Sequence, residues 1–522
     1  MKNKITAGFL ILLAALVLFS GCSPKTQAGS AAPDVLSLTV DRPIFTESPV
    51  GKLVETEWRK ALDKYMGMPV NLTINEVPYG DYSERLSIYM ASGEWADIFS
   101  WNGGDISSLF DLGEQGLLLN LRDYPDQTKN FFSLTPDTAL KTITSEDNGV
   151  YMFHDLLISS YNGSQECVRV NVDVLNRHNL KVPETLDDLY QLAKQLKALY
   201  PDTFPITGYA GMLQNNIMRA FHGGRKLYYN GSKFVYGNRE NAFRQGLEYL
   251  HKLYAEKLLD PEWYTDNETQ RTAKLNTGKS FIAYSYSDMD PESHPGVTLG
   301  YIPYLSPDGS TVPWYPNDNQ RGVILAGGYC ILINAKTKYP ELAMKIVDFQ
   351  YSKEMLTLFN WGVEGTTYTV QADGSKQFVP EIMNAPNMSL KMAEYGINTS
   401  YSVRSGIQFV PQDRDVAVAT MPNVPVYLNG SFNQIMSCWK YYDDLEKAGK
   451  AIQAPVAPSV SFTSAERDQI STIRTIIDTF ADEYEMKFIT GEVSLSQWDR
   501  YLSEFKALAD IDVVLNIYNS KL

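Results

Sequence analysis

The stretch "YPELAMKIVDFQYSKEMLTLFNWGVEGTTY", residues 339–368, combines a helical pattern with an abrupt end. Pro340 stands where a first helical turn tolerates a missing N–H, and apolar residues then recur at helical spacing. The pattern stops at "FNWGVEGTTY", which holds Trp361, Glu364 and two glycines. A charged residue such as Glu364 is not expected in a buried core, and a large aromatic residue such as Trp361 is not expected in a plain linker. We therefore consider this loop a candidate part of a binding site.

Outward from this stretch, strand-like and helix-like segments alternate along the chain. Strands are predicted at 35–40, 69–74, 96–100, 150–153, 167–172, 280–286, 297–305 and 323–334. Helices are predicted at 57–66 and 239–256, and capping pairs indicate three more helix starts, at Asp81–Glu84, Thr185–Asp188 and Thr463–Glu466. Strand–helix–strand units of this size predict an α/β fold with mostly parallel sheets flanked by helices.

The first residues resemble an export signal. Lys2 and Lys4 precede an apolar run from Phe9 to Phe19, which is shorter than the roughly 20 residues that span a membrane. The run ends in "LFSGC", which looks like a bacterial lipobox, although Phe19 stands where Leu is usual. We expect residues 1–21 to be a lipoprotein signal peptide, Cys22 to be the lipidated residue, and 22–33 to be a flexible tether. An ordinary signal peptide with an unmodified Cys is the alternative.

Composition excludes several classes of protein. Roughly 500 residues are too many for a single core, so two or more domains are expected. A net charge of -15 without basic runs argues against nucleic acid and against an anionic membrane surface as partners. Cys167, Cys330 and Cys438 allow one disulfide at most, and no metal-binding Cys/His spacing occurs. Aromatic residues reach 12%, with 33 Tyr and 8 Trp, which suits a sugar-facing surface.

Five stretches, in this order, resemble the extracellular solute-binding lipoproteins of bacterial carbohydrate ABC transporters. They are the lipobox, "SGEWADIFSW" (92–101), "VRVNVDVLNRHNLKVPETLDDLYQLAKQLK" (168–197), the stretch 339–368 and "YEMKFITGEVSLSQWDRYLSEFKALA" (484–509). Ala96 departs from the family pattern, which usually has Pro there. The resemblance covers nearly the whole chain after the signal peptide.

The resemblance implies a two-lobed periplasmic-binding-protein-like fold of type II, similar to maltose-binding protein, with a hinge of crossing strands and a ligand cleft between the lobes. The crossings are expected near 156–166, 303–310 and 358–362. Lobe 1 is then 34–160 plus 306–359, and lobe 2 is 161–305 plus 360–522. The loop 359–368 is thereby placed at the third crossing, where Glu364 would bind sugar hydroxyls or pin the loop by accepting backbone N–H groups. Trp361 would be a sugar platform or would pack at the hinge.

Candidate ligand-binding residues in lobe 1 follow two strands, because ligands in open α/β sheets meet the carboxyl ends of strands. Trp101 and Asn102 lie just past the strand at 96–100, and Asp105 lies in the same Gly-rich loop. In maltose-binding proteins, a Trp four residues after the strand's Asp touches sugar, which is the offset of Trp101 here. Asp41 and Arg42 follow the first strand, where a solvated salt bridge is the alternative role.

Two further segments supply candidate residues. Trp314 and Tyr315 lie on a Pro-stiffened loop beside the second crossing. Tyr209, Asn215, Asn216 and Arg219 are candidates from lobe 2, although a capped helix start explains the Asn pair equally well.

The resemblance implies a non-enzymatic monomer, lipid-anchored on the outer face of the cell membrane, that delivers an oligosaccharide to ABC permease subunits. A peptide-binding transport lipoprotein and a glycoside hydrolase are the alternatives; a hydrolase would need two carboxylates flanking a sugar bond. No cofactor is expected. A structural calcium is possible at "SPDGS" (306–310) or "NDN" (317–319), where oxygen ligands are available.

Overall fold

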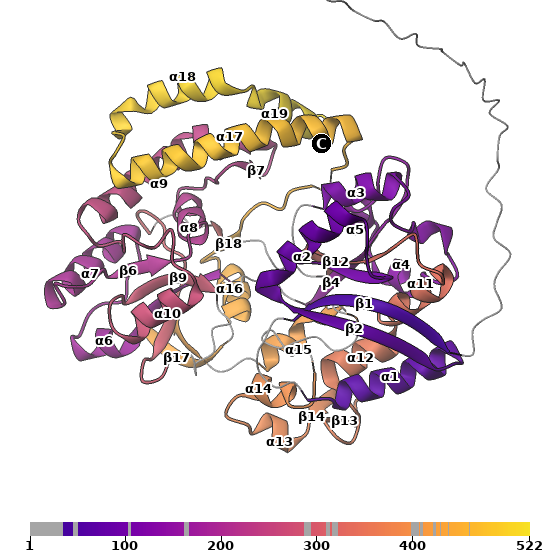
Figure 1. Ribbon diagram of the computed structural model, residues 1–522. Helices are drawn as coiled ribbons and strands as arrows, with labels where there is room; N and C mark the ends of the chain where they lie inside the picture. The colour runs from indigo at the N-terminus through magenta and orange to yellow at the C-terminus, as the bar shows by residue number, and fades with distance from the viewer. Residues whose placement is uncertain are drawn as a thin grey trace, which may run out of the picture.

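The computed structural model describes residues 35–44, 51–102, 106–160, 166–286, 294–309, 314–315, 322–397, 407, 411–420, 424–428, 430–436, 438–458 and 460–522. These residues form two six-stranded sheets, each with its own hydrophobic core and its own helices (Figure 1). The predicted two-lobed α/β fold is confirmed. Cys22, Asp105 and the segment 317–319 lie outside the described residues.

The first sheet has the strand order β15-β4-β12-β3-β1-β2. Its strands are β1 (Leu36–Ile44), β2 (Val70–Pro78), β3 (Ile98–Asn102), β4 (Phe153–Ser159), β12 (Gly322–Ile333) and β15 (Gln412–Asp413). β1 pairs in parallel with β2 and β3, whereas β12 is antiparallel to β3 and β4.

The second sheet has the order β17-β16-β10-β5-β9-β6. Its strands are β5 (Glu166–Asn171), β6 (Ile206–Gly208), β9 (Ile282–Tyr286), β10 (Leu299–Ile302), β16 (Val424–Leu428) and β17 (Ser431–Met436). β5 is antiparallel to both β9 and β10, while β6 is parallel to β9.

The predicted mostly parallel arrangement is confirmed with exceptions, since β12 in the first sheet and β5 and β17 in the second run opposite to the other strands of their sheets. β5 follows the passage from β4, and β12 follows the passage from β10, so each enters its sheet from the other lobe. A strand that enters at the junction runs away from it, opposite to neighbours that run toward it. As a result, the carboxyl ends of β1, β3 and β4 in one sheet and of β6, β9 and β10 in the other lie on the junction side.

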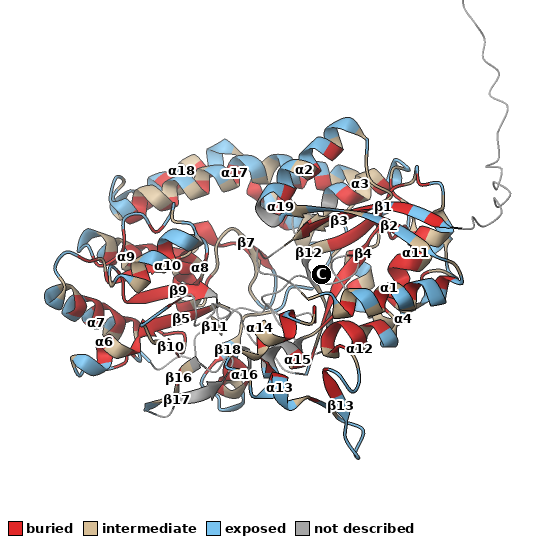
Figure 2. Cartoon of the chain, turned by 60° about the horizontal axis from the view of Figure 1, so that its bottom comes forward, coloured by how far each residue is buried: buried red, intermediate tan, exposed pale blue. Residues whose placement is uncertain are grey.

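Helices with buried inner faces cover the first sheet (Figure 2). They are α1 (Leu53–Met66), α2 (Tyr79–Ser92), α3 (Ser107–Glu114), the 3-10 turn η1 (Leu121–Asp123), α4 (Lys129–Leu134), α5 (Asp137–Thr142), α11 (Pro340–Phe349), α12 (Lys353–Trp361), α13 (Pro380–Met383), α14 (Met388–Ala393) and α15 (Arg414–Ala419), with the hairpin β13 (Tyr368–Val370) and β14 (Lys376–Phe378). The predicted strand-to-helix passage into α11 is confirmed, with Pro340 in its first turn.

The second lobe has helices of its own, and residues 460–522 form a C-terminal helical module on top of its sheet. Its helices are α6 (Val172–Arg177), α7 (Leu186–Leu199), α8 (Met212–Ala220), η2 (Gly237–Arg239), α9 (Asn241–Ala255), α10 (Glu268–Asn276), α16 (Cys438–Lys447), α17 (Ser464–Thr490), η4 (Leu495–Gln497), α18 (Trp498–Leu508) and α19 (Ile511–Asn519). Two short pairs complete it: β7 (Leu227–Tyr229) with β8 (Phe234–Tyr236), and β11 (Trp314–Tyr315) with β18 (Ile452–Gln453). Cys167 and Cys330 are both buried, and they lie in different sheets.

The segment after Trp361 differs from the predicted lobe division. Tyr368, Phe378, Met392 and Val416 belong to the core of the first sheet, and β15 pairs with β4. The chain passes to the second sheet only between α15 and β16, and not at 358–362. The prediction that 360–522 belongs entirely to lobe 2 is therefore wrong for the part up to α15. The apolar side chains of this insertion complete the first core, which explains its position.

Two of the three predicted caps are present. Thr185–Asp188 and Thr463–Glu466 form full capping boxes at the starts of α7 and α17. Asp81 does not cap α2, because that helix begins two residues earlier, after Pro78. Proline fixes the backbone before the helix, so the helix starts without a side-chain cap.

Candidate functional site

The end of β3 brings Trp101 and Asn102 to the junction side of the first sheet. Trp101 is half-buried, and its buried indole N–H meets no acceptor among the described residues. Asn102 is buried, and its Nδ2 lies 3.4 Å from Ser83 Oγ on α2. The partly exposed ring of Trp101 suits contact with a ligand, whereas its N–H is covered in this arrangement, and Asp105 lies outside the described residues.

Asp41 and Arg42 are committed to contacts inside the first lobe. The parallel register of β1 and β2 places Asp41 beside Asn75 and Arg42 beside Glu76. The Asp41 carboxylate accepts from Asn75 Nδ2 at 2.7 Å and from the Arg85 guanidinium at 2.9 Å. Arg42 Nε donates to Glu76 at 3.1 Å. Both predicted residues are thus buried ion-pair members rather than solvated ones.

In the second lobe, the predicted residues of α8 gather on a carboxylate that sequence reasoning missed. Asn216 Nδ2 and Arg219 Nη1 each lie 3.1 Å from Glu166 Oε2, at the start of β5. Asn215 is half-buried. No sequence motif marks Glu166 as a site residue. Its position beside α8 becomes clear only from the pairing of β5 with its neighbouring strands. The three groups form a polar cluster at the junction end of this sheet.

Two aromatic rings of the second lobe are backed by basic side chains. Tyr209 follows β6, and the guanidinium of the buried Arg271 lies 3.1 Å from its ring centre. Trp314 stacks on His222, with ring centres 5.2 Å apart and planes inclined by 7°. Sequence reasoning missed Arg271 and His222, which no motif distinguishes. Of Tyr315 the structure describes the backbone, which pairs with β18.

Trp361 and Glu364 do not lie at a lobe crossing. Trp361 stacks on Phe378 of the β13–β14 hairpin, with ring centres 4.7 Å apart. Glu364 is exposed. Thr367 holds the loop instead, because its Oγ1 accepts from Val363 N at 2.7 Å and donates to the Trp361 carbonyl at 2.8 Å. The predicted hinge packing of Trp361 and loop-pinning role of Glu364 are both wrong.

A cavity of about 520 Å³ lies between the two lobes, within the roughly 300–1,000 Å³ range of ligand pockets. The first lobe and the C-terminal module both supply its walls. From the first lobe come Ile106, Phe110, Thr142 and Thr144; from the module come Val460, Ser461, Phe462, Arg467, Ile470, Ser471, Arg474, Thr475, Asp478 and Tyr518. Ile106, one of the wall residues, comes four residues after Asn102 in the sequence. Sequence reasoning predicted none of these residues.

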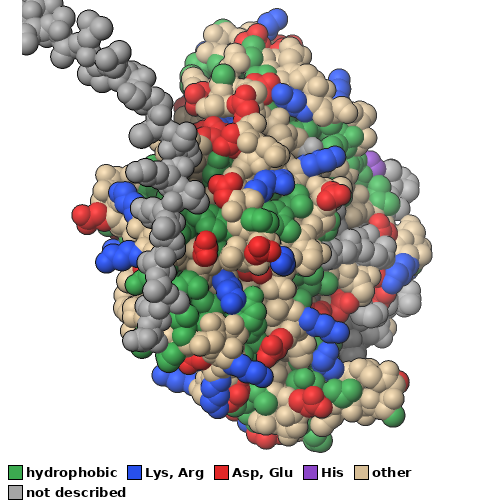
Figure 3. Space-filling model, turned by 90° about the vertical axis from the view of Figure 1, so that its right-hand side faces the viewer, with side chains coloured by type: hydrophobic (Ala, Val, Ile, Leu, Met, Phe, Trp, Pro, Cys, Tyr) green, Lys and Arg blue, Asp and Glu red, His purple; other side chains and the backbone are tan. Residues whose placement is uncertain are grey.

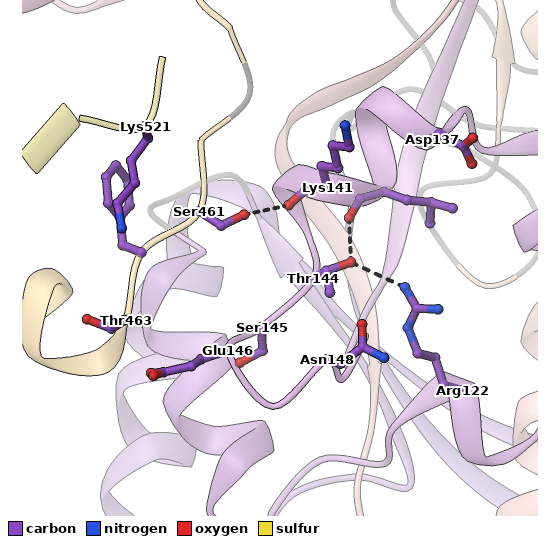
Figure 4. A pocket seen from close by; sticks show the side chains of 12 residues that line it. Arg122, Asp137, Lys141, Thr144, Ser145, Glu146, Asn148, Ser461, Thr463 and Lys521 are labelled. Carbon is purple, nitrogen blue, oxygen red and sulfur yellow. Dashed lines mark hydrogen bonds between the residues drawn. The ribbon is translucent and has the colours of Figure 1, made fainter. Parts of the chain in front are cut away.

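A second cavity of about 590 Å³ shares three wall residues with the first: Thr144, Ser461 and Phe462. Figure 4 shows the segment that leads into α17 beside α5 of the first lobe, with Ser461 Oγ donating to the Lys141 carbonyl at 2.9 Å. Arg122 and Thr144 line the opposite wall, 3.5 Å apart. The segment 460–463 therefore separates two cavities and forms part of each.

The described residues contain no group of three or more His, Cys, Asp and Glu that could hold a metal ion. The predicted calcium loop at 306–310 is described up to Gly309, whose N–H donates to Ser306 Oγ at 2.9 Å.

On the face of the first lobe in Figure 3, acidic and basic side chains are interspersed rather than gathered by sign. Within the described part of the chain, no helix is both long and apolar enough to cross a membrane.

A family described as "Bacterial extracellular solute-binding protein" matches residues 52–356, more than half of the chain. The chain belongs to this family. The solute-binding protein is 24% identical to Lipoprotein LipO of Bacillus subtilis (strain 168), over 71% of this chain and 75% of LipO. It is also 21% identical to the fructooligosaccharide ABC transporter substrate-binding protein FusA of Streptococcus pneumoniae serotype 4, over 97% of this chain and 99% of FusA.

Solved structures share the fold of this solute-binding protein. The crystal structure of alginate-binding protein AlgQ2 without calcium ion matches with a TM-score of 0.68 and 19% identity, over 93% of this chain and 97% of AlgQ2. At this level of sequence identity, the similarity shows a shared fold alone. The relatives are named as binding or transport proteins and not as enzymes.

Proposed function

We propose that this solute-binding protein captures an oligosaccharide between its lobes and delivers it to the permease of an ABC importer. The observation that carries the proposal is the cavity of about 520 Å³ with walls from both lobes. A ligand held by both lobes stabilises one lobe arrangement over others, which is the signal that a permease can recognise. The relatives named for fructooligosaccharide and alginate support a sugar as the ligand.

The cavity walls have the chemistry that a sugar requires. Phe110, Phe462 and Tyr518 line the cavity, and aromatic side chains are the type that contacts the C–H faces of pyranose or furanose rings. Thr144, Ser471 and Thr475 offer hydroxyl groups. A pocket of apolar rings with a few placed hydrogen-bonding groups is typical of small-molecule sites.

The predicted ligand-binding residues divide into two groups in this proposal. Trp101, Asn102, Tyr209, Asn215, Arg219 and Trp314 would form a further part of the site along the junction, and Asp105 and Tyr315 stay candidate ligand residues from the sequence alone. Asp41 and Arg42 support the sheet end from behind through their ion pairs. Trp361 and Glu364 are left out, because they lie on the β13–β14 side of the first lobe.

The wider cellular role follows from the family and the first residues. The protein would act without catalysis, as a monomer, held on the outer face of the membrane by a lipid on Cys22. We infer a first lobe of 35–159 plus 322–420 and a second lobe of 166–309 plus 424–522. A structural calcium is not part of the proposal.

Titration calorimetry of the chain without its first 21 residues, with fructooligosaccharides, alginate oligosaccharides, maltooligosaccharides and peptides, tests the proposal. One sugar class should bind, and Phe462→Ala should weaken that binding in a protein that still unfolds cooperatively, although loss of the ring contact with Tyr518 should lower its melting temperature. Met383→Ala is the matched control, since this exposed apolar residue lies on the far part of the first lobe. Binding of peptides alone would overturn the sugar proposal, and release of shorter sugars would indicate a hydrolase.

A further inference from the structure

The segment that leads into α17 leaves the second lobe and contacts the first. Ser461 binds the Lys141 carbonyl on α5, and the backbone N–H of Ser464 donates to Glu146 at 3.2 Å. Figures 1 and 2 both show this end of α17 beside α3. The contact is therefore a bridge between lobes at one edge of the cavity.

Arg467 supplies the charged part of this bridge. Its side chain is 7% exposed, and its guanidinium lies 2.6 Å from Asp111 and 3.5 Å from Glu114, both on α3. Nη1 also donates to the Phe462 carbonyl at 2.9 Å, and the guanidinium lies 5.4 Å from the ring centre of Phe110. A cation on a helix of the second lobe is thus buried against two carboxylates of the first.

The remainder of α17 is fixed to the second lobe. The buried Glu485 binds Arg225 at 2.9 Å, and Asp478 accepts from Tyr236 at 2.7 Å. Ile477 and Phe488 belong to the second core. A helix of 27 residues is about 40 Å long, so α17 is a stiff arm anchored on one lobe with its tip on the other.

We propose that Arg467 is an interlobe clasp that stabilises the lobe arrangement in which the cavity is enclosed. Any hinge motion that separates α3 from α17 takes Arg467 from its two carboxylates, so the arrangement described here gains an ion pair that a separated arrangement lacks. The clasp raises the fraction of protein that is competent to hold ligand, and apparent affinity follows that fraction. Arg467 is a positioning residue in this account, which rests on the proposed ligand site between the lobes.

Arg467→Met tests the clasp, because it keeps the apolar stem against Phe110 and removes the charge. We expect the affinity for the bound sugar to fall about tenfold, a typical size for coupling between sites. Asp111→Asn should give a similar loss, and the double variant should lose little more, since the two residues act through one contact. Arg225→Met is the matched control: it breaks a buried ion pair of α17 inside the second lobe, so it should lower the melting temperature and leave affinity unchanged.

Small-angle X-ray scattering without ligand gives a second reading. The radius of gyration should increase in Arg467→Met and Asp111→Asn and stay the same in Arg225→Met. An unchanged radius in both clasp variants would overturn the clasp, whether or not any sugar binds. A raised radius in a protein that binds none of the sugars would support the clasp and reject the proposed function. Equal affinity losses in Arg467→Met and Arg225→Met would reduce Arg467 to a general stabilising residue.

Discussion

Trp361 ends α12 and packs on the hairpin that follows it. Its ring stacks on Phe378 and meets Tyr368 edge to face, with centres 6.0 Å apart. Aromatic pairs add roughly 0.5–1.5 kcal/mol to the energy of burial alone. The sequence around Trp361, with a neighbouring Gly and a nearby Glu, predicted a binding role for this residue. Its packing on the hairpin could not be predicted, because local sequence does not reveal which later segment covers the ring.

Trp361→Ala should lower the free energy of unfolding by about 2 kcal/mol, because it removes a stacked and half-buried ring. Denaturant unfolding followed by circular dichroism measures the change. Phe378→Ala, which removes the other ring of the stack, should give a similar loss. Sugar affinity should be unchanged in both variants, and a selective loss of affinity in Trp361→Ala would restore the ring as a ligand platform.

His294 gives the fold a dependence on acid. Burial first, and the positive charge of Arg169 second, lower the pKa of His294 to about 4. The unfolded chain binds this proton near pH 6.5, so the folded state does not gain it until the pH is much lower. The free energy of unfolding should therefore be intact above pH 6.5 and fall as the pH drops toward 4, by at most about 3 kcal/mol.

Urea unfolding of wild type and His294→Asn between pH 4 and 7 measures this loss. The variant keeps a donor for Asn276 Oδ1, which lies 2.6 Å from His294 Nδ1. Its stability should match that of wild type at pH 7 and decline less below pH 6. Parallel curves for the two proteins would show that other groups set the acid sensitivity.

At the scale of an element, α17 shows which helix signals are reliable. Thr463 and Glu466 form a capping box, and Gly491 ends the helix in the left-handed conformation with φ of 81°. Both signals are local, so sequence predicts them well. Asp81 and Glu84 have the same spacing, yet α2 starts at Tyr79 because Pro78 already fixes the chain there.

Thr463→Ala should cost about 1 kcal/mol of stability, the usual value of a helix N-cap. Asp81→Ala is the matched control, since Asp81 lies in the first turn of α2 without capping it, and its effect should stay below about 0.5 kcal/mol. Thermal and denaturant unfolding of both variants compare the two. Equal losses would mean that the side-chain cap of α17 contributes no more stability than an uncapped first-turn residue of α2.

At the scale of the whole molecule, sequence predicted the architecture but not where the chain changes lobes for the third time. The α/β alternation and the ordered resemblances are spread along the chain, so they identify the fold. The segment from α13 to α15 belongs to the first core through Ile382, Met392 and Val416. Such membership depends on contacts with residues far away in sequence, and so do the cavity walls supplied by α3 and α17.

The position of α17 to α19 at the end of the chain sets an order of events during biosynthesis. The core of the first lobe has all its members once Val416 has been made, whereas the second core includes Phe488, Tyr501 and Leu515. Chains are made from the N-terminus, and domains generally fold as units. The first lobe can thus be complete while the second still exposes the apolar surface that α17 and α18 will cover. Docking of these last helices completes the second core, and it also forms the contact between Arg467 of α17 and the carboxylates of α3.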